Sequence, residues 1–226
     1  MKKAILFFAM LFFTQMAFGQ IKAVTENGDS AILYENGTWE YPLLINAPLI
    51  DPMFGLTFDT DTVEEFNIPL NPEFFRKSSD ATFLLKSRKG NFGVWLNQQD
   101  WSCKKQKGEH DYQCINIRRG IYAMLISEKT YIPVEWLVEA ALINAKKVAT
   151  DLKIITQEYR YVNGVEVLMM QMSGIIEGVK MTFLGYYYSN KNGSVQVVTY
   201  SVDNIAKKHR KEMEKFLNGF VEVYQK

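Results

Sequence analysis

The sequence is poor in the residues on which most catalytic and metal sites depend. It contains two cysteines and two histidines in 226 residues. It has no glycine-rich phosphate loop and no cluster of histidines and cysteines at zinc-ligand spacing. Neither sign of charge prevails, because there are 26 basic and 25 acidic residues, and this balance does not favour a nucleic acid as partner. We therefore expect no cofactor, no metal ion and no nucleic-acid interface.

The apolar run at the N-terminus is too short to favour a membrane anchor. Two lysines precede this run, which extends from Ala4 to Phe13, and Ala17 and Gly19 then supply small residues at the two cleavage-defining positions. This pattern is typical of a secretory signal peptide over residues 1–19, with Gln20 as the first residue of the mature chain. We expect a periplasmic or secreted protein that has no membrane span after cleavage.

The two cysteines, Cys103 and Cys114, most simply form one disulfide in an exported protein. They flank a polar loop, and closing a loop of this size contributes roughly 3 kcal/mol of stability. The alternative is a metal site in which the cysteines join His110 and either Glu109 or Asp111. Zinc-ligand spacing is missing, so we favour the disulfide.

Neither histidine lies in a catalytic motif. His110 stands beside Glu109 and Asp111 in the polar loop, where we expect a solvated segment. His209 falls in the apolar stripe of the last expected helix, where we expect a half-buried packing residue. A general base needs a hydrogen-bonded partner and a positioned nucleophile, and no motif here supplies them. We therefore predict no catalytic residue.

The N-terminal region, residues 20–41, has the pattern of a small β-meander. Short β-prone segments alternate with Asn27-Gly28 and Asn36-Gly37, which favour tight turns. The Asn-Gly-Thr-Trp-Glu-Tyr stretch resembles a short hairpin near the N-terminus of secreted proteins from Bacteroidetes-type bacteria. Residues 42–81 follow with five of the six prolines and no clean period, so we expect a linker there.

Residues 82–226 have the pattern of an α+β domain. Pro133 fits the first turn of a helix, Asn163-Gly164 favours a hairpin turn, and Asp203 can cap a closing helix. Antiparallel strands with one wet face need helices on the other, so we expect an antiparallel sheet packed against helices. The expected helices are 133–148 and the segment after 203, and the expected strands are 82–87, 92–97, 112–118, 121–127, 154–161, 165–172, 180–188 and 195–200.

The order of these elements resembles the PsbP-like fold. The resemblance is carried by Val165–Met172, Lys180–Tyr188 and Val195–Tyr200, and by the closing Phe-Leu-Asn-Gly-Phe stretch at 216–220. It implies an α+β sandwich. Because members of that fold are mostly non-catalytic binding or assembly factors, it also implies a binding function, but it brings no functional motif with it.

The central strands concentrate methionine and tyrosine. Core packing explains such a concentration, but methionine also adapts to varied ligands, so an apolar groove is the alternative. The candidate ligand-binding residues are Met170, Met172, Met181, Tyr186 and Tyr188.

These observations favour a non-catalytic binding or assembly module of the bacterial cell envelope, with an envelope protein as partner. The first alternative is a carrier of a small apolar ligand, which would use the methionine and tyrosine residues. The second is an envelope hydrolase or metal enzyme built on Glu109, His110 and Asp111.

Overall fold

The chain divides into two units, residues 1–43 and 44–226. The first unit holds a small antiparallel sheet in the order β1-β2-β3, formed by β1 (Ile21–Val24), β2 (Ser30–Leu33) and β3 (Trp39–Glu40). The expected signal peptide lies outside the described residues and stays a prediction. The structure is a computed structural model that describes residues 21–24, 30–33, 39–40, 68–106, 110–149 and 151–223.

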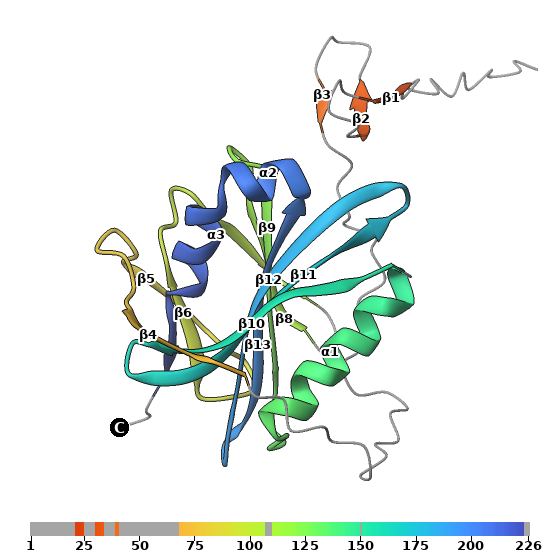
Figure 1. Cartoon of the computed structure of the whole chain (residues 1–226). Coiled ribbons are helices and arrows are strands. Elements are labelled where there is room, and N and C mark those ends of the chain that lie inside the picture. Colours follow the sequence, from red (N-terminus) through yellow and green to blue (C-terminus); the bar gives the residue numbers. More distant parts are fainter. Residues whose placement is uncertain are drawn as a thin grey trace, which may run out of the picture. The chain divides into compact units, whose positions relative to one another are not determined.

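The second unit is built on an eight-stranded sheet in the order β4-β10-β11-β12-β13-β9-β8-β7 (Figure 1). A smaller antiparallel sheet has the order β14-β6-β5. The strands of both sheets are β4 (Leu70–Phe75), β5 (Phe83–Lys86), β6 (Phe92–Leu96), β7 (Ser102–Lys105), β8 (His110–Asn116), β9 (Ile121–Glu128), β10 (Lys153–Val162), β11 (Val165–Ile176), β12 (Val179–Asn190), β13 (Gly193–Val202) and β14 (Phe220–Glu222).

One edge of the main sheet differs from the predicted antiparallel arrangement. β4 runs parallel to β10, with Leu70 opposite Tyr159 and Phe75 opposite Val162, so the sheet is mixed. This strand falls in the predicted linker, residues 42–81, and the end of that segment therefore belongs to the sheet. Pro72 lies in an edge strand, where a missing N–H costs no ladder bond if it faces outward.

Helices cover both faces of the main sheet, where the sequence predicts one wet face. α1 (Val134–Val148) packs against β11 and β12 on one face, and α2 (Asp203–Lys208) and α3 (Arg210–Leu217) pack on the opposite face (Figure 1). All ten residues of β13 are buried as a result. The core on the α3 side also includes side chains of the small sheet, among them Phe92 and Phe220. Within the described part of the chain, no helix is long and apolar enough to cross a membrane.

The backbone angles confirm the predicted hairpin turn and correct the predicted closing helix. Asn163 and Gly164 have φ of 50° and 85°, so the predicted Asn-Gly hairpin turn joins β10 and β11. The single closing helix that the sequence predicts is instead broken at His209, whose φ of −115° and ψ of 27° separate α2 from α3. Phe220, expected at the end of that helix, begins β14.

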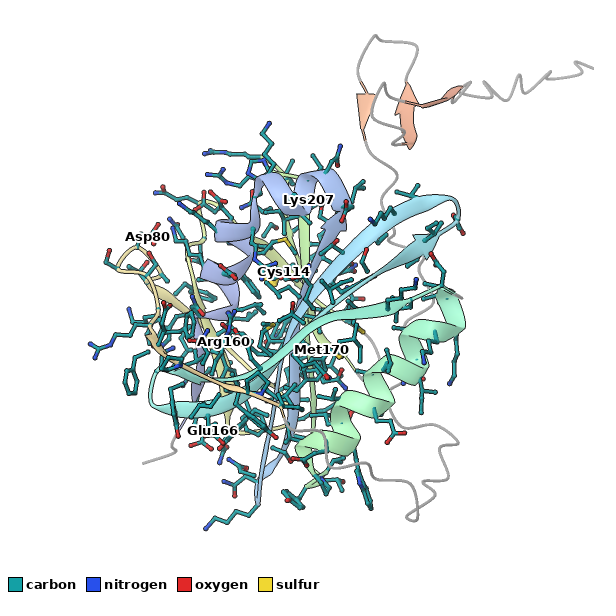
Figure 2. The ribbon with its side chains drawn as sticks, viewed as in Figure 1. Asp80, Cys114, Arg160, Glu166, Met170 and Lys207 are labelled. Atoms are coloured by element: carbon teal, nitrogen blue, oxygen red, sulfur yellow. A yellow bond between two sulfur atoms is a disulfide. The ribbon has the colours of Figure 1, made fainter. Side chains whose placement is uncertain are left out.

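A buried cation joins the edge strand to the core. Arg160 of β10 is 6% exposed and lies near the centre of the unit (Figure 2). Its Nε is 2.5 Å from Glu158 Oε1, and its Nη1 donates a 3.2 Å hydrogen bond to the hydroxyl of Tyr186. The guanidinium also lies 4.5 Å from the ring centre of Phe75 in β4. Burial raises the pKa of Tyr186 to about 12, so the hydroxyl that accepts from Arg160 stays protonated.

Candidate functional site

The predicted polar loop around His110 is in part a strand. His110 and Asp111 belong to β8, with the backbone of His110 opposite Ile126, while Glu109 lies outside the described residues. The register shifts between His110 and Tyr112, which places Asp111 in a β-bulge. Asp111 is 0% exposed, so the prediction of a solvated segment is wrong for this residue.

Asp111 anchors the turn between β5 and β6. Its Oδ2 accepts hydrogen bonds from Ser87 Oγ at 2.6 Å and Ser127 Oγ at 2.5 Å. Ser87 Oγ in turn accepts from the backbone N–H groups of Lys89 and Gly90, both at 3.0 Å. These bonds tie the turn of the small sheet to β8 and β9 of the main sheet. Across the described residues, no group of three or more His, Cys, Asp or Glu side chains is arranged to hold a metal ion.

His209 lies at the junction between α2 and α3. It is half-buried, as expected for a packing residue, and its Nδ1 is 3.9 Å from Glu212 Oε2. Its carbonyl accepts the backbone N–H groups of Glu212 and Met213 and so starts α3. These contacts give His209 a structural role at the break in the helix.

The sheet divides the five candidate ligand-binding residues between its two faces. Met170, Met172 and Met181 are buried on the face that carries α1, because they alternate with residues of the core beneath α3. Tyr186 is buried on the opposite face. Tyr188 is half-buried on that same face, where it lines an open hollow of about 380 Å³ and donates a 2.6 Å hydrogen bond to Glu222. The methionines and tyrosines therefore do not meet in one groove, and their burial favours the packing alternative.

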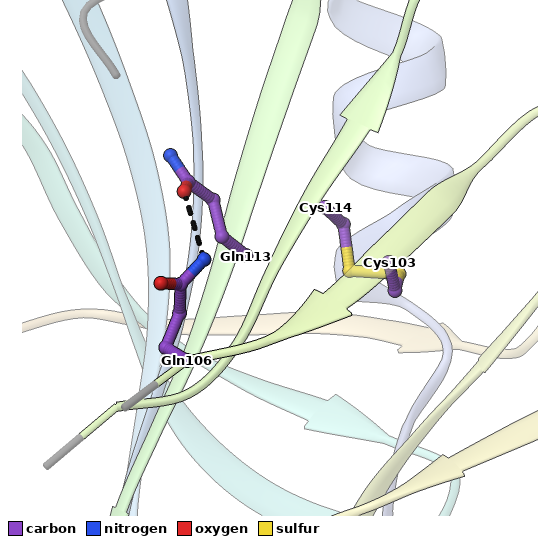
Figure 3. The surroundings of a disulfide bond; sticks show 4 residues. All are labelled: Cys103, Gln106, Gln113 and Cys114. Carbon is purple, nitrogen blue, oxygen red and sulfur yellow. Dashed lines mark hydrogen bonds between the residues drawn. A yellow bond between two sulfur atoms is a disulfide. The ribbon is translucent and has the colours of Figure 1, made fainter. Parts of the chain in front are cut away.

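The predicted disulfide is confirmed. Cys103 of β7 and Cys114 of β8 are directly opposite in the antiparallel ladder and are bonded (Figure 3). Just after β7, the amide of Gln106 donates a 3.1 Å hydrogen bond to Gln113 Oε1 of β8 (Figure 3). Cys114 is 1% exposed, so the bond is part of the core beneath α3.

A hollow of about 110 Å³ lies between α3 and the ends of the strands that face it. Its apolar wall includes Trp95, Trp101 and Phe216, and the rings of Trp101 and Phe216 are 4.4 Å apart. Asn116, the last residue of β8, also lines the hollow and is 1% exposed. Among the described residues, Asn116 Oδ1 has no hydrogen-bond partner. A buried acceptor without a partner costs free energy, which a bound donor would recover.

Charged side chains surround this hollow. Arg119 Nη1 is 3.2 Å from Glu212 Oε1, and Lys215 Nζ is 2.5 Å from Asp80 Oδ2 at the rim. Asp80 lies in the turn beside α3 (Figure 2). The hydrogen bond from Lys215, with smaller contributions from Ser78 and Asn97, lowers the pKa of Asp80 to about 2.

Two further charges line the hollow, and they have opposite sign. Lys211 lies on the exposed side of α3, and Asp100 lies in the turn after β6. Within the described part of the chain, no ion pair engages either of them. The hollow thus combines an apolar wall, one buried amide acceptor and an unpaired charge of each sign among the described residues.

Sequence reasoning missed this site because its parts are far apart along the chain. Trp95, Asn116 and Lys211 belong to three different elements, and only the packing of α3 onto the sheets brings them together. The basic face of the last helix was the one local signal, and most such faces are only solvated.

Comparisons with known proteins identify similar structures but no matching sequence family. No family model matches the chain, and no curated protein matches it. Among solved structures, LpqN of Mycobacterium tuberculosis, described as involved in cell envelope biogenesis, is 10% identical with a TM-score of 0.45, covering 63% of this chain and 90% of LpqN. A protein from Bacteroides thetaiotaomicron is 8% identical with a TM-score of 0.43, covering 63% of this chain and 50% of that one.

The cyanobacterial PsbP protein of Synechocystis sp. PCC 6803 is also similar. It is 12% identical with a TM-score of 0.49, and the match covers 65% of this chain and 95% of that one. The order of strands and helices predicts a PsbP-like fold, and this PsbP protein is among the similar solved structures.

Proposed function

We propose that this protein is a non-catalytic binding module of the bacterial cell envelope, and that the hollow beside α3 is its binding site. The observation that carries the proposal is the buried Asn116, a residue of the hollow's lining whose Oδ1 has no hydrogen-bond partner among the described residues. Binding sites usually combine an apolar wall with a few converging polar groups, and here Trp101 and Phe216 provide the wall.

A location outside the cytoplasm has separate support. The bond between Cys103 and Cys114 is of a kind that persists in oxidising compartments and is rare in the cytosol. The N-terminal pattern over residues 1–19 predicts export. We propose a periplasmic or secreted protein that reaches its ligand or partner there.

Asp111 and His209, two of the residues that the sequence offers as catalysts, have structural contacts. Asp111 holds the hydroxyls of Ser87 and Ser127, and the backbone of His209 starts α3. A general acid or base contributes about 10²- to 10⁴-fold to the rate of an enzyme that uses it. An enzyme that depended on His110 or His209 would therefore lose nearly all function when that residue is replaced.

Complementation of a deletion strain tests the proposal. We expect His110→Ala and His209→Gln to correct whatever defect the deletion strain shows, and Lys211→Glu to fail, because it reverses the one charge of α3 in this lining that no ion pair of the described residues neutralises. Lys208→Glu is the matched control, since Lys208 is exposed on α2 and does not line the hollow. Protein level and circular dichroism are measured for each variant. Failure of an abundant, folded His110→Ala protein would contradict the proposal and favour the enzyme alternative.

A further inference from the structure

The hollow beside α3 has features that restrict the chemistry of its ligand. Asn116 Oδ1 can only accept a hydrogen bond, so a ligand that satisfies it must carry an N–H or O–H donor. The oxygen is buried, so a ligand reaches it only if the side chain rotates about χ2, a torsion that is broad in asparagine. A ligand without a donor leaves this acceptor unpaired.

The charges around the hollow add a second requirement. Glu212 already neutralises Arg119, and Asp80 neutralises Lys215. Lys211 is the remaining cation of the lining within the described residues, and its ammonium group can donate up to three hydrogen bonds to an anion. Arg119 also lines the hollow and has further guanidinium donors, so a carboxylate group suits this lining.

The size of the hollow limits the ligand to a few atoms. Its volume of about 110 Å³ is smaller than the cavity of about 150 Å³ that holds benzene. A large aromatic ligand does not fit wholly inside it. A small molecule fits, and so does the terminal residue of a longer chain, because the hollow opens to the surface beside the exposed Lys211.

We propose that the hollow binds a small group in which an N–H donor stands next to a carboxylate. A free small amino acid and the C-terminal residue of a peptide share this chemistry. The N–H donates to Asn116 Oδ1, the carboxylate accepts from Lys211 with Arg119 beside it, and the short side chain contacts Trp101 and Phe216. The ammonium of a free amino acid would also be compensated by Asp100. This inference rests on the proposed function, because it names the ligand class of the same site.

Four small probes test the inference on the full chain. Glycine carries the whole pattern as a free amino acid, and N-acetylglycine carries it as the end of a peptide. Acetate lacks the donor, and glycinamide lacks the carboxylate. The probes are titrated while the indole N–H signals of Trp95 and Trp101 are followed by NMR, and the signals are assigned by tryptophan-to-phenylalanine substitution.

We expect glycine or N-acetylglycine to shift both signals with an affinity about tenfold higher than that of acetate and glycinamide, since one hydrogen bond to a charged group is worth about a factor of ten. The stronger of the two names the source of the ligand. Lys211→Gln should weaken the stronger probe about five- to tenfold, and the control Lys208→Gln should leave its affinity unchanged.

Two results would overturn the inference, and they differ in what they mean for the proposed function. Equal binding of acetate or glycinamide at the same signals would show that the hollow binds ligands but that the chemical class is wrong. The absence of any shift with all four probes would also refute the inference. The complementation results for Lys211→Glu and Lys208→Glu then decide separately whether the hollow is the binding site.

Discussion

Replacement of Arg160 by methionine should destabilise the protein strongly. The change removes the ion pair with Glu158 at 2.5 Å, the hydrogen bond to Tyr186 and the contact with the ring of Phe75. Breaking a buried ion pair on one side costs about 3–5 kcal/mol. The Glu158 side chain is 19% exposed in the folded protein and can regain some hydration once Arg160 is gone. We therefore expect the low end of that range, about 3 kcal/mol.

A double substitution separates the charge from the packing. Glu158→Met together with Arg160→Met replaces the pair by apolar side chains of similar length, which is often nearly neutral. We expect the double variant to lie within about 1 kcal/mol of the natural protein. Urea unfolding followed by tryptophan fluorescence measures each variant, and in a thermal scan the single variant should melt about 6–12 °C lower. A loss below about 1 kcal/mol in the single variant, or additive losses in the double, would refute the reasoning.

Three further predictions concern backbone contact, pH and boundaries. Gly219→Ala places a Cβ 2.0 Å from the Trp95 carbonyl oxygen and should lower the free energy of unfolding in urea by about 3 kcal/mol or more. The control Gly164→Ala meets no atom within 4 Å and should cost only about 1 kcal/mol, because of its positive φ. Equal costs would contradict the contact argument. Because the folded-state pKa of Asp80 is lowered from 3.8 to about 2, its stabilisation is fully present above pH 3.8 and is lost as the pH falls through about 2. The stability difference between the natural protein and Asp80→Asn should therefore shrink across that window, and a constant difference would argue against it. A protein truncated to start at residue 68 should melt cooperatively, and one that starts at residue 82, without β4, should melt at lower temperature; equal melting would show that β4 adds nothing.

Local patterns predict the fold well where the signal lies within one hairpin or helix. Asn163-Gly164 supplies two positive φ values between β10 and β11, and the apolar period after Pro133 supplies α1. Cys103 and Cys114 pair because each strand of their hairpin places one of them at the same register position. In each case neighbouring residues carry the whole signal.

The features that the sequence does not reveal depend on distant pairing. Pro72 within β4 argues against a strand in the sequence, and only the edge position beside β10 allows one there. The sequence predicts Asp111 in a polar loop, but the bulge buries its carboxylate. Burial is possible because Ser87 and Ser127, which are distant along the chain, donate hydrogen bonds to it. The hollow likewise needs Asn116 and α3 to meet, and no spacing along the chain predicts that contact.

A crystal structure of the protein grown with N-acetylglycine tests the central claim most directly. We predict that the ligand occupies the hollow beside α3, with its N–H on Asn116 Oδ1, its carboxylate within hydrogen-bond distance of Lys211 Nζ, and its methylene against Trp101. A structure in which the hollow holds only water, or in which the ligand binds elsewhere on the protein, would contradict the claim that this hollow binds an N–H donor next to a carboxylate.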